Sequence, residues 1–132
     1  MVRESNYRKE TILVVDDAEA IRKMVCAMLS QHGYACLEAS DGREALRTLA
    51  YEPVHLVLTD VLMPGMGGVE LAMRLKAERP GMRVMFMSGY SENPVVRHIE
   101  TIPGTFLAKP FTAGVLMEKV RQMLDKPWEG SE

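Results

Sequence analysis

Four short, mostly apolar segments of this chain each end directly before a polar residue. They are Ile12–Val15 before Asp16, Val54–Thr59 before Asp60, Val84–Met87 before Ser88, and Phe106–Ala108 before Lys109. Longer stretches with apolar residues at helical spacing separate these segments. Strands that alternate with helices must pair in parallel through crossover connections, and continuous apolar runs are typical of strands covered on both faces. The chain is therefore predicted to fold as an α/β protein.

The pattern of strand followed by helix occurs five times along the chain. Predicted strands cover 11–15, 35–39, 54–59, 83–87 and 105–108, and predicted helices cover 18–32, a segment opening at Asp41, 68–78, a short segment beginning at Asn93-Pro94, and a segment after Thr112. Right-handed crossovers then favour a doubly wound, flavodoxin-like (βα)5 fold with a five-stranded parallel sheet in the order 2-1-3-4-5.

Two predicted helices have recognisable starts. Asp41 followed by Glu44 resembles a capping box, in which the two side chains satisfy free backbone amides at the helix start. Thr112 is a suitable N-cap for the last helix. Phe111 before it is placed to pack on Leu116 as a hydrophobic staple.

Size and charge limit the possible functions. The chain has 132 residues and a net charge of −2. The length suits one domain, which is predicted over 11–125 with tails at 1–10 and 126–132. The slightly negative net charge predicts no attraction to nucleic acid or to an anionic membrane. No apolar run approaches a membrane span, and the first ten residues lack the apolar centre of a secretion signal, so a cytoplasmic location is expected.

The two cysteines are Cys26 and Cys36. Their spacing does not match a metal site, and Cys26 falls on the apolar face of a predicted helix. A buried free thiol is the favoured interpretation, because unpaired cysteines are usually buried. A disulfide or redox switch between the two is the alternative.

Three carboxylates are predicted to meet at one edge of the sheet. In the order 2-1-3-4-5 the first and third strands are neighbours, so Asp16, Asp17 and Asp60 come together where ligands bind in such sheets. Clustered carboxylates repel each other unless a cation is present. Hard oxygen ligands of this kind suit Mg²⁺. A magnesium site is predicted there.

Lys109 and Ser88 are predicted to reach the same edge from the last two strands. The Lys109 ammonium is a mobile point charge suited to a phosphoryl oxygen, and Ser88 offers a hydroxyl donor. An Asp60 carboxylate flanked by Mg²⁺, an ammonium and a hydroxyl is equipped to form an aspartyl-phosphate.

Four motifs together resemble the receiver domain of two-component response regulators. They are ILVVDD, LVLTDVLMPGMGG, VMFMSGY and FLAKPF, and the resemblance covers about residues 11–125. It implies that Asp60 accepts a phosphoryl group from a phosphohistidine on a sensor histidine kinase. It also implies that Asp16 and Asp17 bind Mg²⁺, with Leu62 contributing its backbone carbonyl.

The resemblance further implies a switch. Ser88 and Lys109 would engage the phosphoryl group, Phe106 would turn inward, and a partner would read a remodelled face. In this chain that face would include Val95, Val96, Ile99, Phe106 and Val115.

Simpler roles remain possible for single residues. Asp17 could only cap a helix, Lys109 could be a solvated lysine, Ser88 an ordinary turn residue, and Phe106 a core aromatic.

The biological setting is also open. The segment VMFMSGYSENPVVRH resembles the C-terminal receivers of hybrid sensor histidine kinases, which favours that setting. The alternative is a stand-alone regulator that docks a target or passes phosphate to a histidine phosphotransfer protein. Direct DNA binding is not expected, and a monomer and a weak dimer are both admissible. Two other functions are a phosphorylation-independent scaffold and a small Mg²⁺-dependent phosphatase. The phosphatase is disfavoured because no positioned general acid or base is evident near Asp60.

Overall fold

The fold is a five-stranded parallel sheet in the order β2-β1-β3-β4-β5. The computed structural model describes residues 10–89 and 106–125. The predicted α/β class and strand order are both confirmed. Along the chain the elements are β1 (Thr11–Val15), α1 (Glu19–Gln31), β2 (Ala35–Ala39), α2 (Gly42–Tyr51), β3 (Leu56–Asp60), α3 (Gly68–Glu78), β4 (Arg83–Ser88), β5 (Phe106–Ala108) and α5 (Ala113–Asp125).

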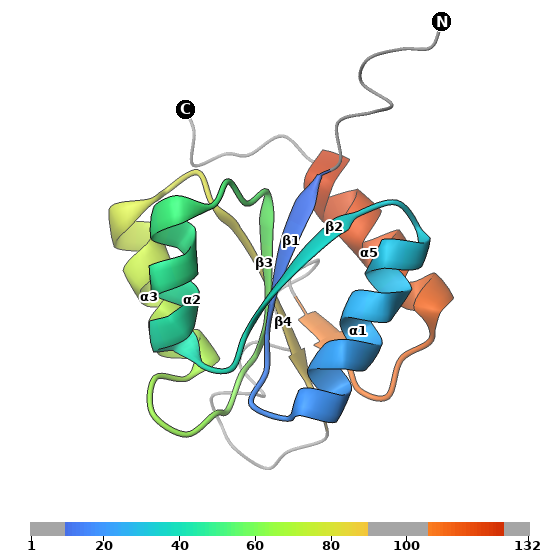
Figure 1. Cartoon of the computed structure of the whole chain (residues 1–132), viewed down its shortest axis with the longest axis horizontal. Helices are drawn as coiled ribbons and strands as arrows, with labels where there is room; N and C mark the ends of the chain where they lie inside the picture. Colours follow the sequence, from blue (N-terminus) through green and yellow to red (C-terminus); the bar gives the residue numbers. More distant parts are fainter. Residues whose placement is uncertain (1–9, 90–105, 126–132) are drawn as a thin grey trace, which may run out of the picture.

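Helices cover both faces of the sheet. Figure 1 shows α1 and α5 on one side and α2 and α3 on the other. Side chains of β1 alternate between the two layers, so that Ile12 and Val14 join the core under α1 and α5. Leu13 and Val15 join the core under α2 and α3. Because the central strands are buried on both faces, their sequences are continuously apolar rather than alternating.

The strand predictions agree closely with the structure, apart from a displacement of the third strand and one further residue, Ser88, at the end of β4. The predicted third strand, 54–59, lies two residues too early at its start, and Asp60 is the last residue of the strand itself. His55 instead joins the first strand from outside the ladder, because its amide donates to the Thr11 carbonyl at 2.8 Å and its Nδ1 accepts from the Thr11 amide at 2.9 Å.

The predicted helix caps are confirmed, with a different partner at α2. The Asp41 side chain accepts from the Glu44 amide at 2.8 Å, as in a capping box. The Glu44 carboxylate, however, accepts from the amide and hydroxyl of Ser40, each at 2.8 Å. Thr112 Oγ1 accepts from the Val115 amide at 3.1 Å. The predicted helix at Asn93-Pro94 lies outside the described residues.

The free-thiol prediction for the cysteines is wrong, because Cys26 on α1 and Cys36 on β2 form a disulfide. Cys26 is buried, as expected from its position on the inner face of the helix. That same face lies against β2, and the Cα atoms of the two cysteines are 5.8 Å apart, within bridging range. Helical periodicity identified the buried face but not what it packs against.

The disulfide is expected to stabilise the fold measurably. It joins residues ten apart, and closing a loop of that length in the unfolded chain contributes about 3 kcal/mol. The Cys26→Ala/Cys36→Ala variant should therefore unfold about 10 °C below the oxidised protein in a thermal scan.

Wild-type protein treated with a thiol reductant is the matched control, since it loses the bond and keeps both side chains. Unchanged unfolding after reduction, together with two alkylatable thiols before it, would restore the free-thiol interpretation.

No helix among residues 10–89 and 106–125 combines the length and the hydropathy that crossing a bilayer requires.

Candidate phosphoryl-acceptor site

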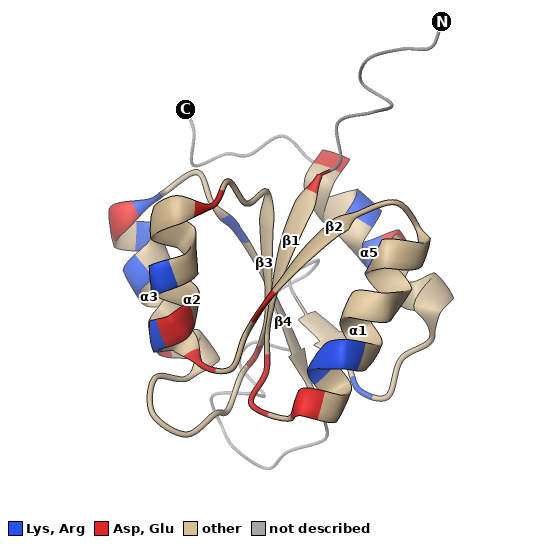
Figure 2. Ribbon diagram, in the orientation of Figure 1, with Lys and Arg blue, Asp and Glu red and all other residues tan. Residues whose placement is uncertain are grey.

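Three carboxylates meet at the carboxyl ends of β1 and β3. Figure 2 shows acidic positions at this lower edge of the sheet. Asp16, Asp17 and Asp60 each offer a carboxylate oxygen, and these oxygens lie within 4.8 Å of one another. β1 and β3 are hydrogen-bonded neighbours in the sheet, with Val15 paired to Thr59. The prediction that topology brings these three residues together agrees with the structure.

Asp16 is the most constrained of the three carboxylates. Its side chain is 1% exposed. Oδ1 accepts from the Ala18 amide at 2.9 Å, and Oδ2 accepts from Lys109 Nζ at 3.0 Å. The Asp16 amide donates to the Ala39 carbonyl at the end of β2, at 3.1 Å. A buried carboxylate requires such partners, because an unpaired charge in the interior is strongly unfavourable.

Lys109 carries positive charge into the cluster. Its Nζ lies 3.0 Å from Asp16 Oδ2 and 3.6 Å from Asp60 Oδ1. The Lys109 amide donates to the Ser88 carbonyl at 2.8 Å, so the residue directly after β5 is tied to the end of β4. With its side chain 22% exposed, the ammonium faces both the carboxylates and solvent. Lys109 is therefore an ion-paired residue of the cluster rather than a solvated surface lysine.

Burial raises the pKa of Asp60 above its ordinary value of 3.8. Desolvation is the main cause, and the negative charge of Asp16 adds to it. The Lys109 charge and the hydrogen bond from the Val61 amide, at 3.0 Å, act in the opposite direction. Asp60 is thus a carboxylate whose charge is only partly compensated by the protein.

The raised pKa predicts that Asp60→Asn stabilises the metal-free protein at neutral pH. The folded state holds the Asp60 proton more tightly than the unfolded chain, so wild-type stability falls as pH rises from 3.8 through the folded pKa. Asparagine removes that loss and can still accept from the Val61 amide. Thermal unfolding in EDTA should show a higher Tm for the variant at pH 7 and a gap that narrows as pH falls toward 4. A variant less stable than wild type at pH 7 would contradict this.

Ser88 reaches the predicted edge, but its hydroxyl points to its own loop. Ser88 is buried at 6% exposure and ends β4, the strand beside β3. Its Oγ donates to the Gly89 carbonyl at 3.1 Å. A phosphoryl contact would require this hydroxyl to rotate toward Asp60.

The other predicted site residues are the metal-binding carbonyl of Leu62, the switch residue Phe106 and the partner-binding face. Leu62 lies in the loop after β3 with its side chain half exposed, and the role of its carbonyl stays a prediction. Phe106 is partly buried and packs in a small cluster around Val61, the residue after Asp60. On the proposed partner-binding face, Val115 is 40% exposed. The other members, Val95, Val96 and Ile99, lie outside the described residues.

The loop between β3 and α3 is held tightly against Asp60. The Gly68 amide donates to the Val61 carbonyl at 2.9 Å, which closes the loop. A Cβ atom at Gly68 would collide with the backbone carbonyl of Asp60, so only glycine fits there. At Gly65 the backbone has a φ of +76°, a conformation that glycine adopts readily. The glycines of this segment therefore shape the turn beside Asp60.

One residue that sequence reasoning missed contacts the site from α1. Arg22 Nη1 donates to the backbone carbonyl of Asp16 at 2.9 Å. The sequence alone assigned no role to Arg22, because no local pattern links it to a carbonyl six residues earlier.

The sheet order and the acidic edge define a class of protein: a doubly wound α/β domain with a carboxylate site at its switch point. Residues 12–121 match the response regulator receiver domain family, and the chain belongs to it. It is a receiver domain of two-component signalling systems, as its motifs led us to expect.

The curated relatives of this chain differ greatly in how much of their length it covers. The chain is 33% identical over 116 residues to sporulation initiation phosphotransferase F of Bacillus subtilis, covering 87% of this chain and 94% of that protein. It is 35% identical over 119 residues to the sensor kinase CckA of Brucella abortus, covering 88% of this chain but only 13% of the kinase. The same domain thus occurs nearly alone and as a small part of a long kinase.

Solved structures agree with this assignment. A CheY-like receiver domain protein from Methanospirillum hungatei matches with a TM-score of 0.79 and 30% identity, over 89% of this chain and 95% of that one. The response regulator TrrA from Thermotoga maritima, solved in complex with Mg²⁺-BeF, matches with a TM-score of 0.77 and 30% identity, over 87% and 99% of the two chains.

The donor set of this chain fits a magnesium ion. The three carboxylates offer hard oxygen ligands within 4.8 Å of one another, and among the described residues Lys109 places an ammonium against them. The raised pKa of Asp60 shows that this compensation is incomplete. A bound divalent cation would supply the missing positive charge.

Proposed function

We propose that this receiver domain accepts a phosphoryl group on Asp60 from a phosphohistidine of a partner protein. The observation that supports this most directly is the position of Asp60. Its carboxylate is partly buried at the end of β3, 3.6 Å from an ammonium and beside two further carboxylates. The residue therefore combines a nucleophilic oxygen with groups that can stabilise charge on an incoming phosphoryl group.

In the proposed transfer, an oxygen of Asp60 attacks phosphorus and forms a P–O bond. The P–N bond to the donor imidazole breaks, and the imidazole leaves with the electron pair and takes a proton from solvent. Negative charge spreads over the three equatorial phosphoryl oxygens during this step. Lys109 lies where it can shift from the carboxylates to one of these oxygens, and Ser88 would donate to another after its hydroxyl rotates.

Asp16, Asp17, Asp60 and the Leu62 carbonyl would hold Mg²⁺. When bound, the ion neutralises the carboxylates and the phosphoryl oxygens. Around it, Lys109 and the Ala18 amide keep the Asp16 carboxylate in one orientation, since both bond to it. A preorganised site of this kind does not need to reorganise during the reaction.

The proposed output is a change at Phe106. This side chain is partly buried against the cluster around Val61, directly beside the acceptor strand end. Movement of Ser88 toward the phosphoryl group would leave room for the ring to turn further inward. Together with Val115 and the predicted face at 95–99, it would present a different surface to a partner.

The proposed partners are a sensor histidine kinase and a histidine phosphotransfer protein. Relatives named as a phosphotransferase and as a sensor kinase support both. The role proposed for the chain is that of a signalling acceptor rather than a dedicated enzyme.

We further propose a cytoplasmic location, because the donor histidines are phosphorylated where ATP is available. Cellular thiols there would reduce the bond between Cys26 and Cys36, so the disulfide of the structure represents the oxidised form of the protein.

The test is the intact mass of the protein after incubation with acetyl phosphate, with Mg²⁺ and with EDTA. One phosphoryl adduct that requires Mg²⁺ is expected. A folded protein that binds Mg²⁺ yet shows no adduct, even with a charged phosphohistidine donor, would contradict the proposal and favour a scaffold.

A further inference from the structure

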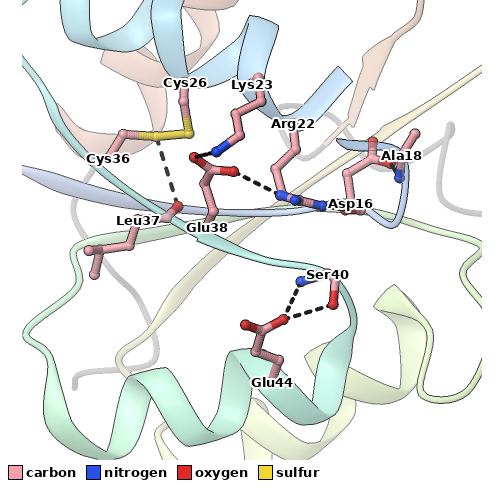
Figure 3. Close-up of polar contacts among 10 residues, drawn as sticks. All are labelled: Asp16, Ala18, Arg22, Lys23, Cys26, Cys36, Leu37, Glu38, Ser40 and Glu44. Atoms are coloured by element: carbon pink, nitrogen blue, oxygen red, sulfur yellow. Dashed lines mark hydrogen bonds and ion pairs between the residues drawn. A yellow bond between two sulfur atoms is a disulfide. The ribbon is translucent and has the colours of Figure 1, made fainter. Parts of the chain in front are cut away.

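Arg22 connects the metal-site loop to two elements of the fold. Figure 3 shows its guanidinium between the Asp16 backbone and the Glu38 side chain. Nη1 donates to the Asp16 carbonyl at 2.9 Å and Nε donates to Glu38 Oε1 at 2.8 Å. The Arg22 side chain is only 14% exposed, so these contacts are shielded from solvent. One residue of α1 thus forms hydrogen bonds both to the loop after β1 and to the strand β2.

The contacted carbonyl belongs to the peptide that joins Asp16 to Asp17. The other side of Asp16 is held by the bond from its own amide to the Ala39 carbonyl. Asp17 follows at once and is exposed, so packing does little to orient it. The orientation of the Asp16–Asp17 peptide therefore determines the position of the Asp17 Cα atom, from which the carboxylate side chain extends.

Glu38 holds the guanidinium in place. The hydrogen bond from Arg22 is the main reason why the pKa of Glu38 lies below its ordinary value, so Glu38 is charged at neutral pH. The planar guanidinium presents several N–H donors in a fixed geometry, which allows one side chain to bind a carboxylate and a carbonyl together. The neighbouring Lys23 also binds Glu38, at 3.1 Å, but its side chain is 59% exposed.

We propose that Arg22 is a positioning residue of the metal site, which fixes the Asp16–Asp17 peptide so that both carboxylates converge with Asp60. The inference rests on the proposed function, because it assumes that this cluster binds Mg²⁺. Partners that orient metal ligands from outside the ligand set are a general feature of metal sites.

Positioning and simple electrostatics predict opposite results for Arg22→Gln. Removing a positive charge near three carboxylates should strengthen cation binding if charge alone matters. Loss of a positioning contact should weaken it, by about tenfold or more.

The test is isothermal titration of metal-free protein with Mg²⁺. We expect weaker binding for Arg22→Gln and an unchanged affinity for Lys23→Gln, which removes the other cation of the Glu38 pair. Arg22→Lys keeps the positive charge, but its ammonium cannot reach both the Asp16 carbonyl and Glu38. This variant should therefore also bind Mg²⁺ more weakly than wild type. Equal or tighter binding in Arg22→Gln would overturn the proposal.

Two controls keep the outcomes distinct. If Arg22→Gln does not fold, as judged by circular dichroism, the Arg22→Lys titration decides: wild-type affinity overturns the proposal and weaker binding supports it. Wild-type protein that binds no Mg²⁺ would instead contradict the magnesium part of the proposed function. Faster exchange of the Ala18 amide in Arg22→Gln, measured by NMR without metal, would independently support the positioning role.

Discussion

Asp60→Asn is expected to abolish the phosphoryl adduct completely. An amide oxygen is a poor nucleophile, and Asp16, the other carboxylate that contacts Lys109, is buried with both of its oxygens hydrogen-bonded. The substitution keeps the shape of the side chain, and the Val61 amide retains its acceptor. Intact mass after incubation with acetyl phosphate and Mg²⁺ should show only unmodified protein.

Asp41→Asn is the matched control for this experiment. Asp41 caps α2 and is not a member of the carboxylate cluster, and asparagine caps helices as well as aspartate does. The control should therefore form the adduct as wild type does. An adduct of equal yield in Asp60→Asn would assign the acceptor to another residue.

Lys109→Met should slow adduct formation and strengthen Mg²⁺ binding at the same time. Loss of one charged donor to the transferring group is expected to reduce the rate by about 10²–10³-fold. The same ammonium lies 3.0 Å and 3.6 Å from two of the carboxylates, where it competes with a cation. Removing it leaves the cluster more negative, so Mg²⁺ should bind more tightly. The measurements are the rate of adduct formation by mass and the affinity by titration.

The matched control is Lys76→Met, at an exposed position near the end of α3. It should change neither quantity. Slower phosphorylation together with weaker Mg²⁺ binding in Lys109→Met would instead mean that Lys109 holds the site together rather than acting on the phosphoryl group.

Much of the fold could be read from local patterns. β1, β2 and α3 begin and end at the predicted residues, because apolar runs and helical stripes reflect burial directly. The caps at Asp41 and Thr112 were predictable for a similar reason, since they depend on residues only three apart. Parallel pairing and crossover handedness then left few possible strand orders.

Predictions of the exact partner of a side chain were less successful. Glu44 bonds to Ser40 rather than completing the box with Asp41, because the backbone turn before α2 brings Ser40 within reach. The cysteines are paired rather than free, because α1 packs its inner face onto β2. Neither contact follows from residue type or spacing.

For the site, chain order already placed four strand ends and their polar residues at one edge of a sheet. Asp16, Asp17, Asp60 and Lys109 do meet there, because parallel neighbours end together. The direction of the Ser88 hydroxyl depends on its side-chain rotamer. The hydrogen bond from Arg22 to the Asp16 carbonyl depends on how α1 packs on the sheet. Those are set by packing across the whole domain, so residues far apart in the chain decide them together.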